Sequence, residues 1–189
     1  SATGSIPAFA DFAARGKPEE PDVTIAGDDI WEILLTSGTT SRPKAVMISH
    51  HYSHYAALGF AMTYSRGLNA ESDLKIVTFL PVVYHIGDHA FVLSALLSGG
   101  SIVIGKVPNA QAMAKAITQN QATGFWAGSP QLLKGVVEAA EEDPAIDLTS
   151  LTVILYGWGS VPPSLFKRLK AVAGEQVRLV GLFGQTEAI

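Results

Sequence analysis

The sequence is organised around one short polar run, Thr36-Ser37-Gly38-Thr39-Thr40-Ser41-Arg42-Pro43-Lys44. The run directly follows the apolar stretch Ile30–Leu35, so a strand is predicted to lead into a loop of threonine, serine and glycine. Hydroxyls and backbone N–H groups bind anion oxygens, glycine allows close approach, and Arg42 and Lys44 add positive charge. The run therefore predicts a loop that binds nucleotide phosphates.

Two other interpretations of this run are open at the level of residue types. A Walker P-loop has the pattern G-x-x-x-x-G-K-[ST], whereas Lys44 here follows Pro43 and precedes Ala45. An ordinary turn rich in serine and threonine needs no ligand, and composition alone favours that interpretation. A more specific pattern is needed to decide.

The run resembles the phosphate loop of the adenylate-forming ligases, the family of acyl-CoA synthetases, luciferases and peptide-synthetase adenylation domains. The usual family form is T-S-G-T-T-G-x-P-K-G, and Ser41 and Ala45 stand here in place of its last two glycines. A positive φ at a residue other than glycine costs about 1 kcal/mol or more. If the family glycine adopts such an angle, Ser41 is expected to weaken ATP binding.

Composition limits the class of protein. Of 189 residues, 48% are hydrophobic and 16% charged, which fits strands covered on both faces or a piece of a larger protein. A net charge of −4 gives no support for nucleic acid or an anionic membrane as partner. The absence of cysteine excludes disulfides and thiolate metal sites. No apolar run is long enough to span a bilayer, so a cytoplasmic location is the default expectation.

Beyond the polar run, strand-like and helical patterns alternate. Residues 45–48 are expected to complete a hairpin, and Ser49 to cap a helix over residues 50–64, whose histidines are interpreted as polar surface. Ser129 is expected to cap the helix that begins at Pro130. Apolar runs follow at 74–80, 101–104, 123–127, 152–156 and 177–183, with helical patterns at 86–97, 109–120, 130–141 and 163–173. This alternation predicts an α/β fold with a mostly parallel sheet and helices on both faces.

The resemblance also implies a domain organisation. Residues 1–28 are interpreted as a linker or lead-in, and residues 29–189 as part of an AMP-binding N-terminal domain. That part divides into a phosphate-loop hairpin at 29–49 and an α/β subdomain at 50–189. The lysine-bearing C-terminal domain of the family would lie beyond Ile189, so the chain is expected to be a fragment without turnover of its own.

In an open parallel sheet, ligands bind beyond the carboxyl ends of the strands. The first such place here is Leu80–Gly87, which contains His85. A lone histidine at a strand-to-helix turn is commonly a helix cap. The family, however, has a proline-then-histidine motif here, whose histidine lies by the acyl substrate, and His85 is implied to line the substrate pocket. The spacing of Asp88 and His89 predicts no role.

The second place is Tyr156–Pro163, where two glycines flank a tryptophan. Two glycines allow the backbone to lie flat against a planar ligand. The alternative is a tight turn with no ligand, which would need only one glycine. The family carries a glycine-rich turn here that lines the adenine and the acyl pocket. The resemblance therefore implies ATP contacts for Gly157, Trp158 and Gly159, and substrate contacts for the last two. Trp158 replaces a small residue, so a narrowed cavity is expected.

The third place is Phe183-Gly184-Gln185-Thr186-Glu187, at the end of the last strand. An aromatic ring can stack on a base, a hydroxyl can bond phosphate, and a carboxylate can hold Mg²⁺. Alternatively, Thr186 caps a helix and Glu187 is an acid of its first turn. The stretch resembles the family motif Y-G-x-T-E, with Phe183 in place of tyrosine. Its first four residues are thereby implied in ATP binding, with Thr186 at the α-phosphate and Glu187 at the magnesium ion.

Three motifs in the family's order identify the chain as a member of the adenylate-forming ligases, most similar to fatty acyl-CoA synthetases. An amino-acid-activating domain would place an aspartate earlier than Asp88, which favours an acyl substrate. The implied reaction joins a carboxylic acid to ATP as an acyl-adenylate, and coenzyme A then displaces AMP. The residues implied to bind the β- and γ-phosphates are Ser37, Gly38, Thr39, Thr40 and Lys44, and Thr36 is also implied in ATP binding. Those implied in catalysis are Lys44, Thr186 and Glu187.

Two hypotheses from other classes remain. One is a non-catalytic module that binds a nucleotide or an acyl ligand, which an open reading frame ending at Ile189 would favour. The other is a phosphate-binding hydrolase, which ATP hydrolysis without an acyl acceptor would favour. For a fragment, apolar surface left uncovered by missing parts is expected to promote self-association.

Overall fold

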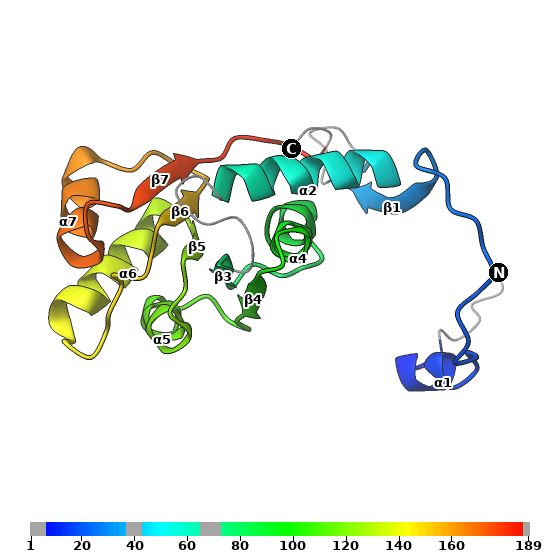
Figure 1. The fold of residues 1–189 in the computed structure, drawn as a ribbon, viewed down its shortest axis with the longest axis horizontal. Coiled ribbons are helices and arrows are strands. Elements are labelled where there is room, and N and C mark those ends of the chain that lie inside the picture. The colour runs from blue at the N-terminus through cyan, green and yellow to red at the C-terminus, as the bar shows by residue number, and fades with distance from the viewer. Residues whose placement is uncertain (1–6, 37–42, 65–72, 187–189) are drawn as a thin grey trace.

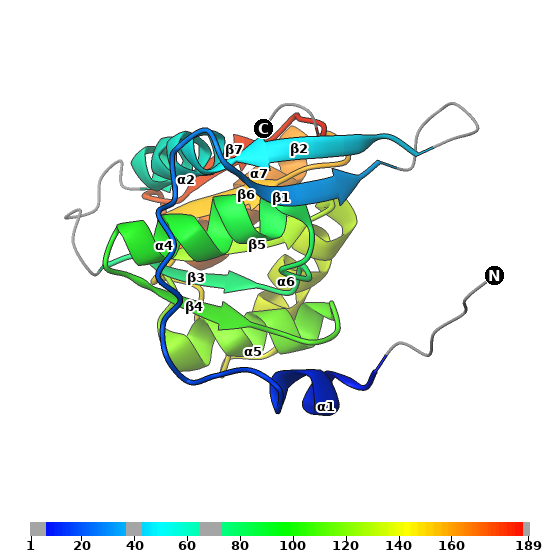
Figure 2. The same cartoon turned by 90° about the vertical axis from the view of Figure 1, so that its right-hand side faces the viewer.

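The computed structural model describes residues 7–36, 43–64 and 73–186. After a short helix α1 (Phe9–Ala13), strands β1 (Ile30–Leu35) and β2 (Ala45–Ser49) form the predicted antiparallel hairpin (Figure 2). Leu35 pairs with Ala45, and the Thr36 N–H donates to the Lys44 carbonyl at 2.9 Å. The polar run therefore starts and ends at one end of a two-stranded ladder.

The second sheet has five strands in the order β4-β3-β5-β6-β7, and every neighbouring pair is parallel. Their bounds are β3 (Lys75–Thr78), β4 (Ser101–Ile104), β5 (Gly124–Gly128), β6 (Val153–Tyr156) and β7 (Arg178–Gly181). The predicted α/β class and parallel sheet are thus confirmed, although several strands are shorter than the apolar runs that predicted them.

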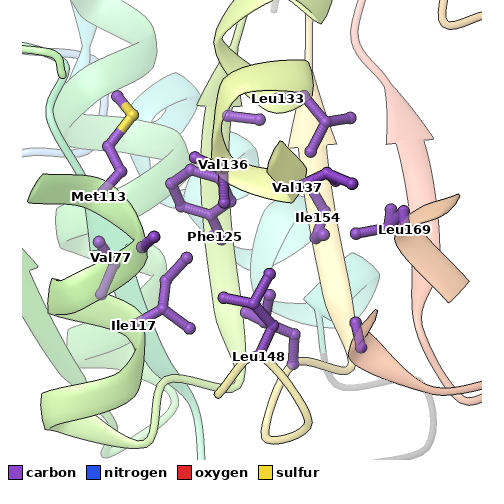
Figure 3. Close-up of a cluster of buried hydrophobic side chains, with 14 of the residues drawn as sticks. Val77, Met113, Ile117, Phe125, Leu133, Val136, Val137, Leu148, Ile154 and Leu169 are labelled. Atoms are coloured by element: carbon purple, nitrogen blue, oxygen red, sulfur yellow. The ribbon is translucent and has the colours of Figure 1, made fainter. Parts of the chain in front are cut away.

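Helices cover both faces of this sheet (Figure 1). On one face lie α5 (Ala110–Asn120), α6 (Pro130–Glu142) and α7 (Pro163–Ala173), and on the other α2 (His50–Tyr64) and α4 (Ser94–Leu97). Successive strand residues point to opposite faces, so Phe125 and Ile154 enter the core under α5–α7 (Figure 3), whereas Trp126 and Leu155 enter the core on the other face.

Local capping sets two helix starts as predicted. The Ser49 Oγ accepts the Tyr52 N–H at 3.2 Å at the start of α2, and the Ser129 Oγ accepts the Leu132 N–H at 3.3 Å at the start of α6. Each such cap contributes about 1 kcal/mol. Among the described helices, none combines the length and the apolar character needed to cross a membrane.

The helix expected over residues 86–97 is not one α-helix. It consists of a single turn α3 (His85–Gly87), a π-helix η1 (Asp88–Leu93) and α4. The Ala90 carbonyl accepts two side-chain hydroxyls, Tyr64 Oη and Ser94 Oγ, each at 2.6 Å. Such side-chain bonds compete with the regular backbone pattern, and π-helical turns are frequent at functional sites. Apolar periodicity does not report these bonds, so the sequence analysis missed the change of helix type.

Candidate functional site

The turns that follow β3, β6 and β7 border one cavity of about 1110 Å³. The sequence-predicted residues that line it are His85, Gly157, Trp158, Gly159, Phe183, Gly184, Gln185 and Thr186. Apolar and aromatic side chains supply most of the remaining wall: Phe60, Leu80, Tyr84, Ile86, Trp126, Tyr156 and Leu182. Three motifs far apart in sequence therefore meet at a single ligand-sized cavity.

The glycine-rich turn after β6 lies close against its neighbours. A Cβ on Gly157 would come within 3.3 Å of the Trp126 ring, and one on Gly159 within 3.3 Å of the Pro130 ring. Between these two glycines, Trp158 has a backbone φ of 59°, in the left-handed region, and it is 72% exposed. Its ring meets Trp126 edge-on at 5.5 Å, so the large residue stands at the wall of the cavity.

The segment after β7 runs beside the end of β6, because the Leu182 N–H donates to the Tyr156 carbonyl at 2.8 Å. Phe183 is fully exposed, which leaves both faces of its ring available to a planar ligand. Thr186 lines the cavity. Glu187, the expected magnesium ligand, lies outside the described residues.

The phosphate-loop residues Ser37, Gly38, Thr39 and Thr40 also lie outside the described residues. At the base of the loop, the Lys44 N–H donates to the Thr36 Oγ1 at 3.4 Å, which closes the hairpin end. Thr36 and Lys44 are not among the residues that line the 1110 Å³ cavity. A single triphosphate held by the loop and Thr186 together stays a prediction.

A buried polar cluster lies behind His85. This histidine begins α3 and is 6% exposed, and its Nδ1 lies 3.5 Å from the Glu32 Oε2 of β1. The ring of Tyr52, from α2, stacks on it with 5.9 Å between centroids. His89, in η1, is fully buried, and its ring centre is 4.3 Å from that of His85. Asp88 completes the cluster, with its Oδ1 2.6 Å from the His89 Nδ1.

Burial governs the protonation of this cluster. It lowers the pKa of His85 to about 4, helped by the nearby His89 and opposed by Asp88. Burial and the charge of Asp88 raise the pKa of Glu32. For His89, burial lowers the pKa, but the hydrogen bond and charge of Asp88 outweigh it, so its pKa is raised. His85 is thus a neutral imidazole at neutral pH.

Several polar atoms of this cluster have no hydrogen-bond partner among the described residues. They are Glu32 Oε2, His85 Nδ1, His85 Nε2 and His89 Nε2. A buried polar atom left unpaired costs about 1–3 kcal/mol. Sequence reasoning missed the cluster, although a charged residue in the middle of the apolar strand Ile30–Leu35 was one available signal.

Similarity to known proteins identifies the family of this chain. The family model of the AMP-binding enzymes matches residues 3–189, nearly the whole chain. The chain belongs to the AMP-binding enzyme family. It is 28% identical over 182 residues to a 3-[(3aS,4S,7aS)-7a-methyl-1,5-dioxo-octahydro-1H-inden-4-yl]propanoyl:CoA ligase of Rhodococcus jostii, a match that covers 96% of this chain and 34% of that protein.

The chain is also similar to a protein that is named a synthase rather than a CoA ligase. Tyrocidine synthase 3 of Brevibacillus parabrevis is 28% identical over 164 residues, covering 85% of this chain and 2% of that protein. Among solved structures, the inhibitor-bound N-terminal domain of FACL13 from Mycobacterium tuberculosis has a TM-score of 0.75 at 22% identity, covering 94% of this chain and 42% of that one. This likeness shows the fold. The chain spans about a third of the Rhodococcus relative's length.

Proposed function

We propose that this chain is the part of an AMP-forming acyl-CoA ligase that binds ATP and the acyl substrate. The observation that carries the proposal is the meeting of three strand-end motifs at one cavity, at the carboxyl ends of parallel strands. Membership of the AMP-binding enzyme family supports the same chemistry. The reaction would convert a carboxylic acid and ATP to an acyl-adenylate, which coenzyme A would resolve to a thioester.

Each motif then has a role. Residues 37–40 and Lys44 would hold the β- and γ-phosphates, and Thr36 would also contact ATP. Thr186 would meet the α-phosphate as charge moves onto the leaving pyrophosphate. Phe183 and the Gly157–Gly159 turn would hold adenine, with Trp158 and Gly159 also touching the acyl group. Mg²⁺ would neutralise phosphate charge when bound, and Glu187 is the residue proposed to hold it.

The wall of the cavity favours an acyl or aromatic acid over an amino acid. None of the described residues that line it is acidic, whereas a substrate ammonium group needs a carboxylate partner. Asp88, the nearest acid in sequence to His85, is hydrogen bonded to His89. The apolar wall instead suits a hydrocarbon chain or ring. Amino-acid activation is the second candidate, because the adenylate-forming ligases that the motifs resemble include peptide-synthetase adenylation domains.

Calorimetry with stable acyl-adenylate analogues tests this choice. A fatty or aromatic acyl analogue is expected to bind more tightly than an aminoacyl analogue of similar size. Tighter binding of the aminoacyl analogue would overturn the acyl assignment. If the acyl-adenylate analogues bind no more tightly than AMP, the result would instead favour the hypothesis of a non-catalytic nucleotide-binding module.

Turnover is a separate question. We propose that the chain by itself binds nucleotide weakly and does not catalyse ATP–pyrophosphate exchange, since it spans about a third of the Rhodococcus relative's length. Robust exchange with a panel of carboxylic acids would refute this. Steady ATP hydrolysis without any acid would support the hydrolase hypothesis.

Self-association is the remaining proposal. Apolar side chains of the hairpin, including Ile33, Leu35 and Met47, are exposed, and such patches promote association. Sedimentation velocity is expected to detect oligomers whose fraction falls in an Ile33→Thr, Met47→Thr double variant. A monomer at all concentrations would exclude the proposal.

A further inference from the structure

The cluster behind His85 carries an inference independent of the proposed function. We propose that Glu32, His85 and His89 bind one divalent transition-metal ion of the zinc type, with Asp88 orienting His89. The four side chains come from β1 and from the consecutive elements α3 and η1. One potential ligand atom from each lies within 4.8 Å of the others.

The spacing between two of the donor atoms suits such an ion. Zinc bonds of about 2.0–2.1 Å in tetrahedral geometry place two ligand atoms roughly 3.3–3.5 Å apart. The Glu32 Oε2 and His85 Nδ1 lie 3.5 Å apart and come from separate elements. They are not hydrogen bonded to each other or to other described residues. The Glu32 oxygen therefore has free lone pairs, and the His85 tautomer with its proton on Nε2 offers the lone pair of Nδ1 to a cation.

The environment of His89 matches a recurrent feature of metal sites. A metal-bound histidine commonly donates its other ring N–H to a carboxylate or backbone carbonyl. The His89 Nδ1 lies 2.6 Å from the Asp88 Oδ1 and 3.0 Å from the His85 carbonyl, so this nitrogen carries the proton. The lone pair is then on Nε2, which is buried and without a partner among the described residues.

The donor types select the class of metal. Two imidazoles and a carboxylate suit zinc, cobalt or nickel, whereas magnesium and calcium prefer oxygen ligands. Three protein ligands leave a fourth position for water or a ligand. The bound ion would tie β1, which leads into the phosphate run, to the histidine at the wall of the large cavity.

Metal titration of the chelator-treated protein tests the site. Calorimetry with Zn²⁺ is expected to give one ion per chain, and Co²⁺ is expected to produce the visible absorption of a tetrahedral complex. Glu32→Gln and His89→Gln should each weaken Zn²⁺ binding more than 10-fold, and Asp88→Asn about 10- to 100-fold. The control His54→Ala removes an exposed histidine of α2 and should bind Zn²⁺ like the parent chain.

A second measurement covers variants that fail to fold. X-ray absorption of the zinc-loaded parent chain is expected to show two imidazole ligands with oxygen ligands completing the shell. One imidazole, or three, would overturn the assignment, and so would the absence of stoichiometric binding. Loss of the ion in His54→Ala but not in Glu32→Gln would move the site to the surface of α2 and also overturn it. None of these readouts depends on ligase activity.

Discussion

The Glu32 carboxylate and the His85 imidazole lie 3.5 Å apart, Oε2 to Nδ1, and join strand β1 of the hairpin to helix α3, which follows strand β3 of the five-stranded sheet. Glu32 sits in the strand that leads to the phosphate run, and His85 lines the large cavity. Any displacement of the hairpin relative to α3 must therefore change this contact. The pair provides a physical link between the predicted phosphate-binding and acyl-binding residues.

Phe183→Ala is expected to weaken AMP binding without changing stability. The ring is fully exposed, so its removal takes away no packing, but a stacked base contributes about 1–3 kcal/mol. Calorimetry should therefore show a loss of about 5- to 150-fold in affinity at an unchanged melting temperature. Phe183→Tyr, which adds a hydroxyl, is the control and should bind AMP at least as tightly. Unchanged AMP affinity in Phe183→Ala would remove adenine stacking from the proposal.

Substitutions at Trp158 separate backbone strain from ring size. Trp158→Ala and Trp158→Gly both remove the ring, but only glycine adopts φ 59° without strain. The glycine variant is expected to be more stable than the alanine variant by about 1 kcal/mol, measured by denaturant unfolding. Both should accept bulkier acyl-adenylate analogues than the parent chain, if the ring narrows the cavity. Equal stabilities would contradict the left-handed conformation.

Two glycine-to-alanine changes within helices should have opposite effects. A Cβ on Gly59, in α2, meets nothing within 4 Å, so Gly59→Ala is expected to stabilise the protein by about 0.5–1 kcal/mol through helix propensity. A Cβ on Gly135, in α6, would lie 2.7 Å from the Ala110 Cβ of α5. Gly135→Ala is therefore expected to destabilise by about 1–3 kcal/mol, because the helices must separate. Thermal unfolding of both variants checks the pair, and two shifts of the same sign would refute this packing.

Alkaline pH should destabilise the protein through Tyr64. Burial raises the pKa of this tyrosine well above its usual value of 10, and its Oη donates to the Ala90 carbonyl at 2.6 Å. Above pH 10 the unfolded chain releases the phenolic proton while the folded chain retains it, so the free energy of unfolding falls as pH rises. Urea unfolding between pH 9 and about 11 should show that the free energy of unfolding falls less steeply with pH in Tyr64→Phe than in the parent chain. Tyr55→Phe, at an exposed position, is the matched control and should follow the parent chain.

Local patterns in the sequence account for most of the architecture. Apolar runs predicted all five strands of the parallel sheet, and Ser49 and Ser129 marked the starts of α2 and α6, because capping and strand burial depend on neighbouring residues. The glycine-rich turn and the Phe183–Thr186 segment were predicted to border a ligand site. Both do line the cavity, since parallel strands bring their carboxyl ends to one edge.

By itself, the sequence determined the succession of strands and helices along the chain, the family motifs and the chemistry expected of those motifs. Tertiary structure alone decided that Glu32 would meet His85, that His89 would be fully buried beside them, and that Asp88 would turn toward His89 rather than the cavity. The reason is physical: a helical or strand period reports which face of an element is apolar. It does not report which polar atoms of distant segments share one buried volume, because that depends on how the hairpin and the π-helix pack together.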